Sequence, residues 1–192
     1  LPKDKIDAAI AKAKGNGSDG AAWVEVVYEG YGPAGVAVYV ECLTDNRNRT
    51  AADVRAAFTK AGGNLGTAGS VAFQFERRGI ILVEKTAAFD EDEMMLAVAD
   101  AGGEDMEVGE EDVVVYTAPG EVMSVKTALE SQGIEVRGAE LTMEATNPQA
   151  VETSDAKKVQ RLIDRLEESD DVQAVYHTMD LTEEQMAELD EL

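Results

Sequence analysis

The chain has 192 residues, of which 44% are hydrophobic and 29% are charged, a composition typical of a globular protein with one or two domains. Apolar runs stay far below the roughly 18 residues that a membrane-spanning helix needs, which excludes such a helix. The single cysteine, Cys42, excludes an internal disulfide framework and suits a reducing cytoplasm. The net charge of −22 excludes most of the surface from binding nucleic acid, because that affinity comes largely from Lys and Arg.

The negative charge is concentrated in the later part of the chain. Residues 1–20 carry a net charge of +1 and residues 21–77 of −1, whereas residues 78–147 carry −13 and residues 148–192 carry −9. We therefore expect only the first 77 residues to approach a polyanion without an electrostatic penalty.

The first predicted element is an Ala-rich helix over residues 5–14, typical of the last helix of a domain that lies upstream. The chain begins at Leu1 rather than Met, and its first residues lack the apolar stretch of a signal peptide. We therefore expect a cytoplasmic fragment or processed form whose natural N-terminus is missing. Two strands are predicted next, over 23–29 and 36–43.

Between these two strands, Gly30, Gly32 and Gly35 match the dinucleotide-binding pattern G-x-G-x-x-G. In that motif a helix begins directly after the loop and directs its free N–H groups at the pyrophosphate. Here a Val-rich strand follows instead, and Pro33 removes one N–H donor. The sequence therefore predicts a β-hairpin turn and no cofactor site.

Further along, a helix is predicted over 51–61, with Thr50 and Asp53 as a capping box, and then a strand over 71–76. The following elements have the order β-α-β-β-α-β of a ferredoxin-like unit: 80–84, 91–101 with Asp90 as N-cap, 105–108, 112–117, 120–132 and a strand within 135–145. An amphipathic helix around 159–166, a strand over 172–179 and an acidic helical tail capped by Thr182 and Gln185 complete the chain.

These elements predict an α/β (α+β) fold with two α/β sandwich domains, the second inserted into the first. Residues 21–77 and 148–181 form the discontinuous first domain, because each piece alone is an incomplete sheet. Residues 78–147 form the ferredoxin-like acidic insert. Residues 1–20 are the end of a helical N-terminal domain, and residues 182–192 are the acidic tail.

The most polar run of the near-neutral domain is TDNRNRT, residues 44–50. Arg47 and Arg49, together with free N–H groups at a helix N-terminus, could hold a phosphate of RNA or DNA. Alternatively, Asn48 and Thr50 cap the helix while the arginines pair with nearby acids, namely Asp45, Asp53 or Glu41. The glycine-rich run 62–70 is either a mobile recognition loop or only a long connection. The sequence leaves both questions open.

No residues suggest catalysis or metal binding. Cys42 is expected in the core and His177 at a strand end, and a single His and a single Cys do not make a zinc site. Neither a G-x-S-x-G motif nor a carboxylate paired with a nucleophile is present. We expect no catalytic residue, no metal and no cofactor.

The run YEGYGPAGVAVYVECLTDNRNRT (28–50), followed by GGNLGTAGSVAFQFERRG (62–79), closely resembles the YebC family. The opening LPKDKIDAAIAKAKG is similar to the end of that family's N-terminal helical domain, and the resemblance spans the whole chain. It implies three domains, of which the basic helical first one is almost entirely missing here, and the third is inserted into the second.

The resemblance implies a non-enzymatic protein, since the family is usually described as probable transcriptional regulators that bind DNA, while other members act on translation and associate with ribosomes. The implied partner is DNA or ribosomal RNA, bound mainly through the missing basic domain. An acidic module that binds a basic protein is a further alternative; neither a membrane nor a small-molecule substrate is expected. The candidate nucleic-acid contacts are Asn46, Arg47, Asn48, Arg49, Thr50, Arg55, Lys60, Asn64, Arg77 and Arg78.

Overall fold

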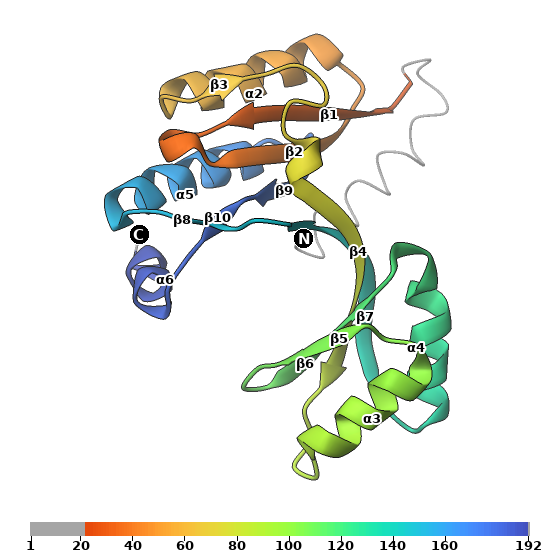
Figure 1. Ribbon diagram of the computed structural model, residues 1–192. Coiled ribbons are helices and arrows are strands. Elements are labelled where there is room, and N and C mark those ends of the chain that lie inside the picture. Colours follow the sequence, from red (N-terminus) through yellow and green to blue (C-terminus); the bar gives the residue numbers. More distant parts are fainter. Residues whose placement is uncertain (1–21, 192) are drawn as a thin grey trace. The chain divides into compact units, whose positions relative to one another are not determined.

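The computed structural model describes residues 22–191, so the helix expected over 5–14 lies outside the described residues (Figure 1). The chain divides into two compact units. The described part of the first unit comprises residues 22–75 and 145–191, and the second unit comprises residues 76–144. The sequence had placed the ends of the insert at 78 and 147.

The first unit contains a four-stranded sheet with the strand order β3-β1-β2-β9. Strands β1 (Val24–Tyr31) and β2 (Ala37–Thr44) form the antiparallel hairpin that the sequence predicted. In the turn between them Gly35 has a φ of +74°, a left-handed conformation that favours glycine. Strand β9 (Val172–His177) pairs with β2, and the short strand β3 (Asn64–Leu65) pairs with the end of β1.

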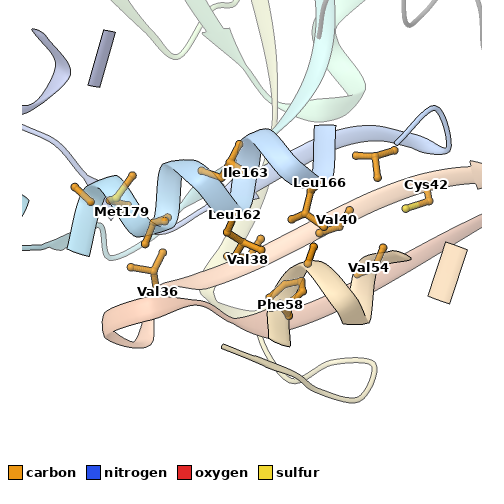
Figure 2. Close-up of a cluster of buried hydrophobic side chains, with 14 of the residues drawn as sticks. Val36, Val38, Val40, Cys42, Val54, Phe58, Leu162, Ile163, Leu166 and Met179 are labelled. Carbon is orange, nitrogen blue, oxygen red and sulfur yellow. The ribbon is translucent and has the colours of Figure 1, made fainter. Parts of the chain in front are cut away.

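Helices α2 (Arg47–Lys60) and α5 (Thr153–Glu167) pack against one face of this sheet (Figure 2). The alternating side chains of β2 that point to this face are apolar, and so are the i, i+3, i+4 positions of both helices. The buried cluster includes Val36, Val38, Val40, Cys42, Val54, Phe58, Leu162 and Leu166. The amphipathic pattern read from the α5 sequence is thereby confirmed.

The C-terminal end of the first unit contains three small elements. Strands β8 (Gln149–Ala150) and β10 (Met179–Asp180) form a two-stranded parallel ladder. Helix α6 (Glu183–Asp190) begins with the predicted capping box, in which Thr182 accepts from the N–H of Gln185 and the Gln185 side chain accepts from the N–H of Thr182.

The second unit has the strand order β5-β6-β4-β7, with its helices interleaved in the ferredoxin-like order β-α-β-β-α-β. Its elements are β4 (Phe75–Glu84), α3 (Glu91–Ala101), β5 (Asp105–Val108), β6 (Asp112–Thr117), α4 (Val122–Ser131) and β7 (Val136–Ala145). Its own buried cluster includes Ile81, Val83, Val98, Val113, Val115, Val125 and Leu129. The predicted fold class is confirmed.

Three predictions about local structure were wrong. Helix α2 begins at Arg47 rather than 51, because the Asn46 side chain caps it by accepting from the N–H of Arg49 at 3.1 Å. Thr50 is therefore inside the helix and caps nothing. The strand expected over 71–76 is a 3-10 turn (Ala72–Gln74), and β4 is one continuous strand that starts at Phe75.

The strand expected over 172–179 is also interrupted. It ends at His177 and resumes as β10 at Met179, because Thr178 turns its hydroxyl to the N–H of Ala37 at 3.0 Å.

Among the helices of residues 22–191, none combines the length and the apolar composition that crossing a membrane requires.

Candidate nucleic-acid interface

The polar run ahead of the predicted helix forms the first turn of α2 in the structure. Thr44 holds the turn before the helix, because its hydroxyl accepts from the N–H of Asn46 at 3.0 Å. Arg47, Asn48 and Arg49 are exposed in the first helical turn, which contains no acidic residue. The free N–H groups and the helix dipole give this end of α2 a partial positive charge.

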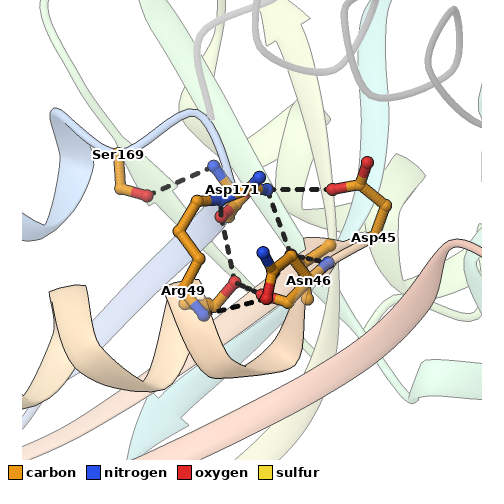
Figure 3. Close-up of polar contacts among 7 residues, drawn as sticks. Asp45, Asn46, Arg49, Ser169 and Asp171 are labelled. Atoms are coloured by element: carbon orange, nitrogen blue, oxygen red, sulfur yellow. Dashed lines mark hydrogen bonds and ion pairs between the residues drawn. The ribbon is translucent and has the colours of Figure 1, made fainter.

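The guanidinium of Arg49 is engaged by carboxylates of the same unit (Figure 3). Its Nε donates to Asp171 Oδ2 at 3.1 Å, and its Nη2 donates to Asp171 Oδ1 and Asp45 Oδ1, both at 2.9 Å. These hydrogen bonds, with those to Asp171 first, raise the pKa of Arg49 above its ordinary value. The alternative that this arginine pairs with Asp45 is therefore confirmed.

Asp171, the second partner of Arg49, is buried, with 3% of its surface exposed. It also accepts from the Thr50 hydroxyl at 2.9 Å, and its backbone carbonyl accepts from the N–H of Leu43. A buried carboxylate is tolerated only when donors surround it, and here two side chains of α2 supply them. Arg49 and Thr50 thus hold the start of α2 to the segment before β9.

A cavity of about 470 Å³ opens beside this ion pair. Its lining consists of Trp23, Asp45, Arg49, Asp53, Ser169, Asp170 and Asp171. Four carboxylates face one guanidinium that two of them already bind, so the cavity disfavours a phosphate group.

The other candidate contacts are distributed over both units. Arg55 and Lys60 are exposed on α2, and Asn64 is exposed in β3, all in the first unit. Arg77 and Arg78 belong to β4 in the second unit.

Arg78 is mostly covered and is occupied by neighbours of its own unit. Its Nη1 donates to Glu144 at 2.6 Å, and its Nη2 donates to Glu104 at 3.4 Å. The guanidinium also lies over the ring of Tyr116, 4.7 Å from the ring centre. We therefore regard it as a structural side chain of the acidic unit.

Three bases on α5 were not among the predicted contacts. Lys158, Arg161 and Arg165 are exposed and lie at i, i+3 and i+7, so that they share one face of the helix. The i, i+3, i+7 spacing is visible in the sequence, but residues 148–192 carry a net charge of −9, so these bases were not predicted as contacts. These residues add positive charge to the helical layer that α2 and α5 form on the sheet.

Glu29 is a buried carboxylate at the end of β1 that holds the glycine-rich loop, a role that was not predicted. It accepts from the N–H groups of Gly69 at 2.6 Å, Val71 at 3.1 Å and Ala72 at 2.6 Å. An acid flanked by Tyr28 and Gly30 gives no sequence signal for this role. The glycine-rich run is thereby an ordered loop with defined backbone contacts.

The residues with redox or acid-base potential have structural surroundings. Burial raises the pKa of the Cys42 thiol to about 12, with the charges of Asp171 and Glu41 adding to the effect. Burial lowers the pKa of His177, whose Nδ1 accepts from the N–H of Met179 at 3.1 Å. Within the part of the chain that the structure describes, no three His, Cys, Asp or Glu side chains gather as a metal site.

Comparison with known proteins places these observations in a family. A model described as the second and third domain of TACO1/YebC matches residues 23–179. A protein of Corynebacterium aurimucosum named "Probable transcriptional regulatory protein" is 49% identical over 191 residues, which cover 100% of this chain and 76% of that protein. One of Rubrobacter xylanophilus with the same name is 49% identical over 189 residues, covering 98% of this chain and 75% of that protein.

A solved structure agrees in fold. The crystal structure of a conserved hypothetical protein, Aq1575 from Aquifex aeolicus, is 41% identical to this chain and superimposes with a TM-score of 0.79. The match covers 95% of this chain and 74% of that one. The chain therefore belongs to the TACO1/YebC family.

Proposed function

We propose that the chain is a non-enzymatic regulator of gene expression that acts in the cytoplasm by binding nucleic acid, in the first place as a DNA-binding transcriptional regulator. The observation that carries this proposal is the 49% identity, over the whole chain, to proteins named as probable transcriptional regulatory proteins. It is consistent with an uneven distribution of charge, in which residues 21–77 carry a net charge of −1 while residues 78–147 carry −13 and residues 148–192 carry −9.

The surface that we assign to the nucleic acid lies on the first unit. The segment 54–75 contains two bases, Arg55 and Lys60, and no acid, although the chain has 39 acidic residues. The exposed bases of α5 lie in the same helical layer as Arg55. Lys and Arg in such a layer contribute affinity by displacing counterions from phosphates.

The second unit contributes repulsion instead of affinity. Residues 76–144 contain eighteen Asp and Glu and five Lys and Arg. Two of those five, Arg78 and Arg137, are bound by carboxylates. Helices α2 and α5 of the first unit, by contrast, each contain more basic than acidic side chains, so we assign the polyanion to them.

The test uses the intact chain with duplex DNA in gel shifts and with ribosomes in sedimentation. We expect the double variant Arg55→Glu and Arg161→Glu to lose about tenfold or more in affinity and to show a shallower salt dependence. The matched control, Lys85→Glu and Lys126→Glu in the acidic unit, makes the same change in net charge and should bind like the parent chain.

The outcome also separates DNA from RNA as the target. Sedimentation with ribosomes in the absence of any duplex DNA shift would contradict the DNA version and leave the alternative, a translation factor that binds ribosomal RNA. Binding to neither would contradict the nucleic-acid proposal as a whole.

The strongly acidic second unit supports a further alternative, an acidic module that binds a basic protein. On that alternative, reversing several charges within residues 90–112 should abolish function, while Arg47→Ala changes little. The nucleic-acid proposal expects the opposite pattern.

A further inference from the structure

Phe73 is the most exposed of the large apolar side chains in the described residues, with 73% of its surface exposed. A single exposed apolar residue is ordinary in a folded protein. Here, however, the ring lies in the 3-10 turn between two buried residues, Val71 at 0% and Phe75 at 8% exposure. Both neighbours fix the turn while the ring between them stays in solvent.

The backbone that carries Phe73 is held from one side by Glu29. The carboxylate accepts three N–H groups of the segment 69–72, directly before the ring. Only 5% of Glu29 is exposed, so its hydrogen bonds to this segment are partly shielded from water. The conformation of the turn is therefore set by the fold, before any ligand is present.

From the other side the turn is held through Gln74, which follows Phe73. The carbonyl of Gln74 accepts from the N–H of Thr146 at 2.9 Å and from its hydroxyl at 3.2 Å. The Gln74 side chain donates to the hydroxyl of Tyr31 at 3.1 Å. Tyr31 is itself a partly exposed aromatic residue, with 37% of its surface exposed.

The segment 54–75, which carries Phe73, contains no acidic residue, and the carboxylate of Glu29, two residues before Tyr31, is occupied by the loop. Exposed Asn64 and Thr67 add polar groups to the same loop. A rigid aromatic ring on a surface that tolerates phosphate is the arrangement that proteins use to stack the unpaired bases of single-stranded nucleic acid.

We propose that Phe73 is a stacking platform for an unpaired nucleobase, and that Tyr31, at the end of β1, is a secondary contact beside the same loop. This inference rests on the proposed function, because it requires that the chain binds nucleic acid. It adds a specific contact for a base, which the arginines and lysines of the helical layer do not provide, since they contact phosphates.

The test measures binding of the intact chain by fluorescence anisotropy. The probes are labelled oligouridine and oligothymidine of about 12 nucleotides, a length within the usual site size for a single-strand binder. A labelled duplex DNA is measured alongside. We expect Phe73→Ala to weaken single-strand binding by about 5- to 150-fold, because one lost base–aromatic stack has that effect. Duplex affinity and thermal stability should stay unchanged.

Two further variants separate stacking from a simple apolar contact. Phe73→Tyr keeps an aromatic face and should bind like the parent chain. Phe73→Leu keeps an apolar side chain without a π-face and should bind as weakly as Phe73→Ala. If Phe73→Leu binds as tightly as the parent, the ring does not stack on a base and the inference is overturned.

The remaining outcomes distinguish this inference from the proposed function. If the parent binds single strands and Phe73→Ala binds them equally well, the stacking site is wrong while nucleic-acid binding stands. If the parent binds neither single strands nor duplex, the proposed function fails. A loss with both oligomers, or with oligouridine alone, supports stacking, and the second result restricts the ligand to RNA.

Discussion

At the scale of single residues, Asp171 organises the start of α2. It receives two hydrogen bonds from Arg49 and one from Thr50, and these three residues connect parts of the sequence more than 120 positions apart. A guanidinium held in this way can contact a phosphate only if it gives up hydrogen bonds to a buried carboxylate. Arg49 is therefore a poorer candidate for nucleic-acid contact than Arg55, which is exposed on the same helix.

We predict that Asp171→Asn destabilises the first unit by about 1.5–3 kcal/mol, because the amide presents N–H groups to donors that need an acceptor. Asp170→Asn, at the exposed neighbouring position, should change stability by no more than about 0.5 kcal/mol. Urea unfolding followed by the fluorescence of Trp23, the single tryptophan, measures both variants. Equal effects of the two substitutions would contradict the role of Asp171.

A second prediction concerns pH. Burial lowers the pKa of His177, so the folded state binds this proton less readily than the unfolded chain does. The contribution of neutral His177 to stability is fully present at a pH above the pKa that the histidine has in the unfolded chain. This contribution is lost as the pH falls below that pKa. We expect the free energy of unfolding to decrease between about pH 7.5 and about pH 5.5, where an unfolded histidine titrates.

The control for this prediction is His177→Asn, which retains an acceptor for the N–H of Met179 and removes the only histidine. Its unfolding free energy should vary much less over the same range. If the unfolding free energy of His177→Asn depends on pH as steeply as that of the parent chain, carboxylates and not His177 cause the pH dependence.

The residue scale is where the sequence was least informative. The choice of Asn46 over Thr50 as the cap depends on where the chain leaves β2, and the Arg49–Asp171 pair depends on tertiary contacts. Both caps were compatible with the local sequence, since Asn and Thr are both favoured at this position. By contrast, Asp90 and Thr182 were each predicted together with the residue at N3, Glu93 and Gln185, and both caps were predicted correctly.

At the scale of elements, close packing explains one glycine of β4. A Cβ added at Gly79 would collide with the side chains of Val122 and Thr117, which come from α4 and β6. Strand and helix therefore approach each other more closely than any larger residue at position 79 allows. A Cβ added at Gly138, in the neighbouring strand β7, would extend into open space.

We predict that Gly79→Ala destabilises the second unit by about 1–3 kcal/mol through overpacking. Gly138→Ala should be nearly neutral, within about 0.5 kcal/mol. Thermal unfolding followed by circular dichroism would show the difference. If Gly79→Ala unfolds at the same temperature as the parent chain, α4 can shift to accommodate the added Cβ without loss of stability.

Elements with strong periodicity were predictable, and short ones were not. The hairpin β1–β2 and the helix α5 have alternating or i, i+3, i+4 apolar residues over many positions. Strands β3, β8 and β10 have two residues each, too few for a period of two to be visible. Apolar residues alternate along 71–76 as they do in a strand. The N–H groups of Val71 and Ala72, however, bind Glu29 instead of a neighbouring strand.

At the scale of the whole molecule, each unit has its own buried cluster. The chain leaves the first unit after Phe75 and returns at Ala145. These two positions are close, because the N–H of Thr146 donates to the carbonyl of Gln74 at 2.9 Å. The second unit therefore interrupts the first at a point where the chain ends nearly meet.

We predict that replacing residues 76–144 by a linker of about three glycine or serine residues leaves a first unit that folds. Residues 75–145 alone should also fold, because their first and last strands are neighbours in one sheet. Cooperative thermal unfolding of each isolated unit would confirm this, and a molten first unit would show that it depends on the insert.

The Glu29 contact has a consequence for how fast any partner is recognised. Because the carboxylate takes up the N–H groups of the loop during folding, those amide hydrogens should exchange slowly with solvent even in the free protein. A partner that reaches this loop meets a surface already in its final shape, so the loop adds no ordering step to complex formation. Collision and orientation alone would then limit the association rate.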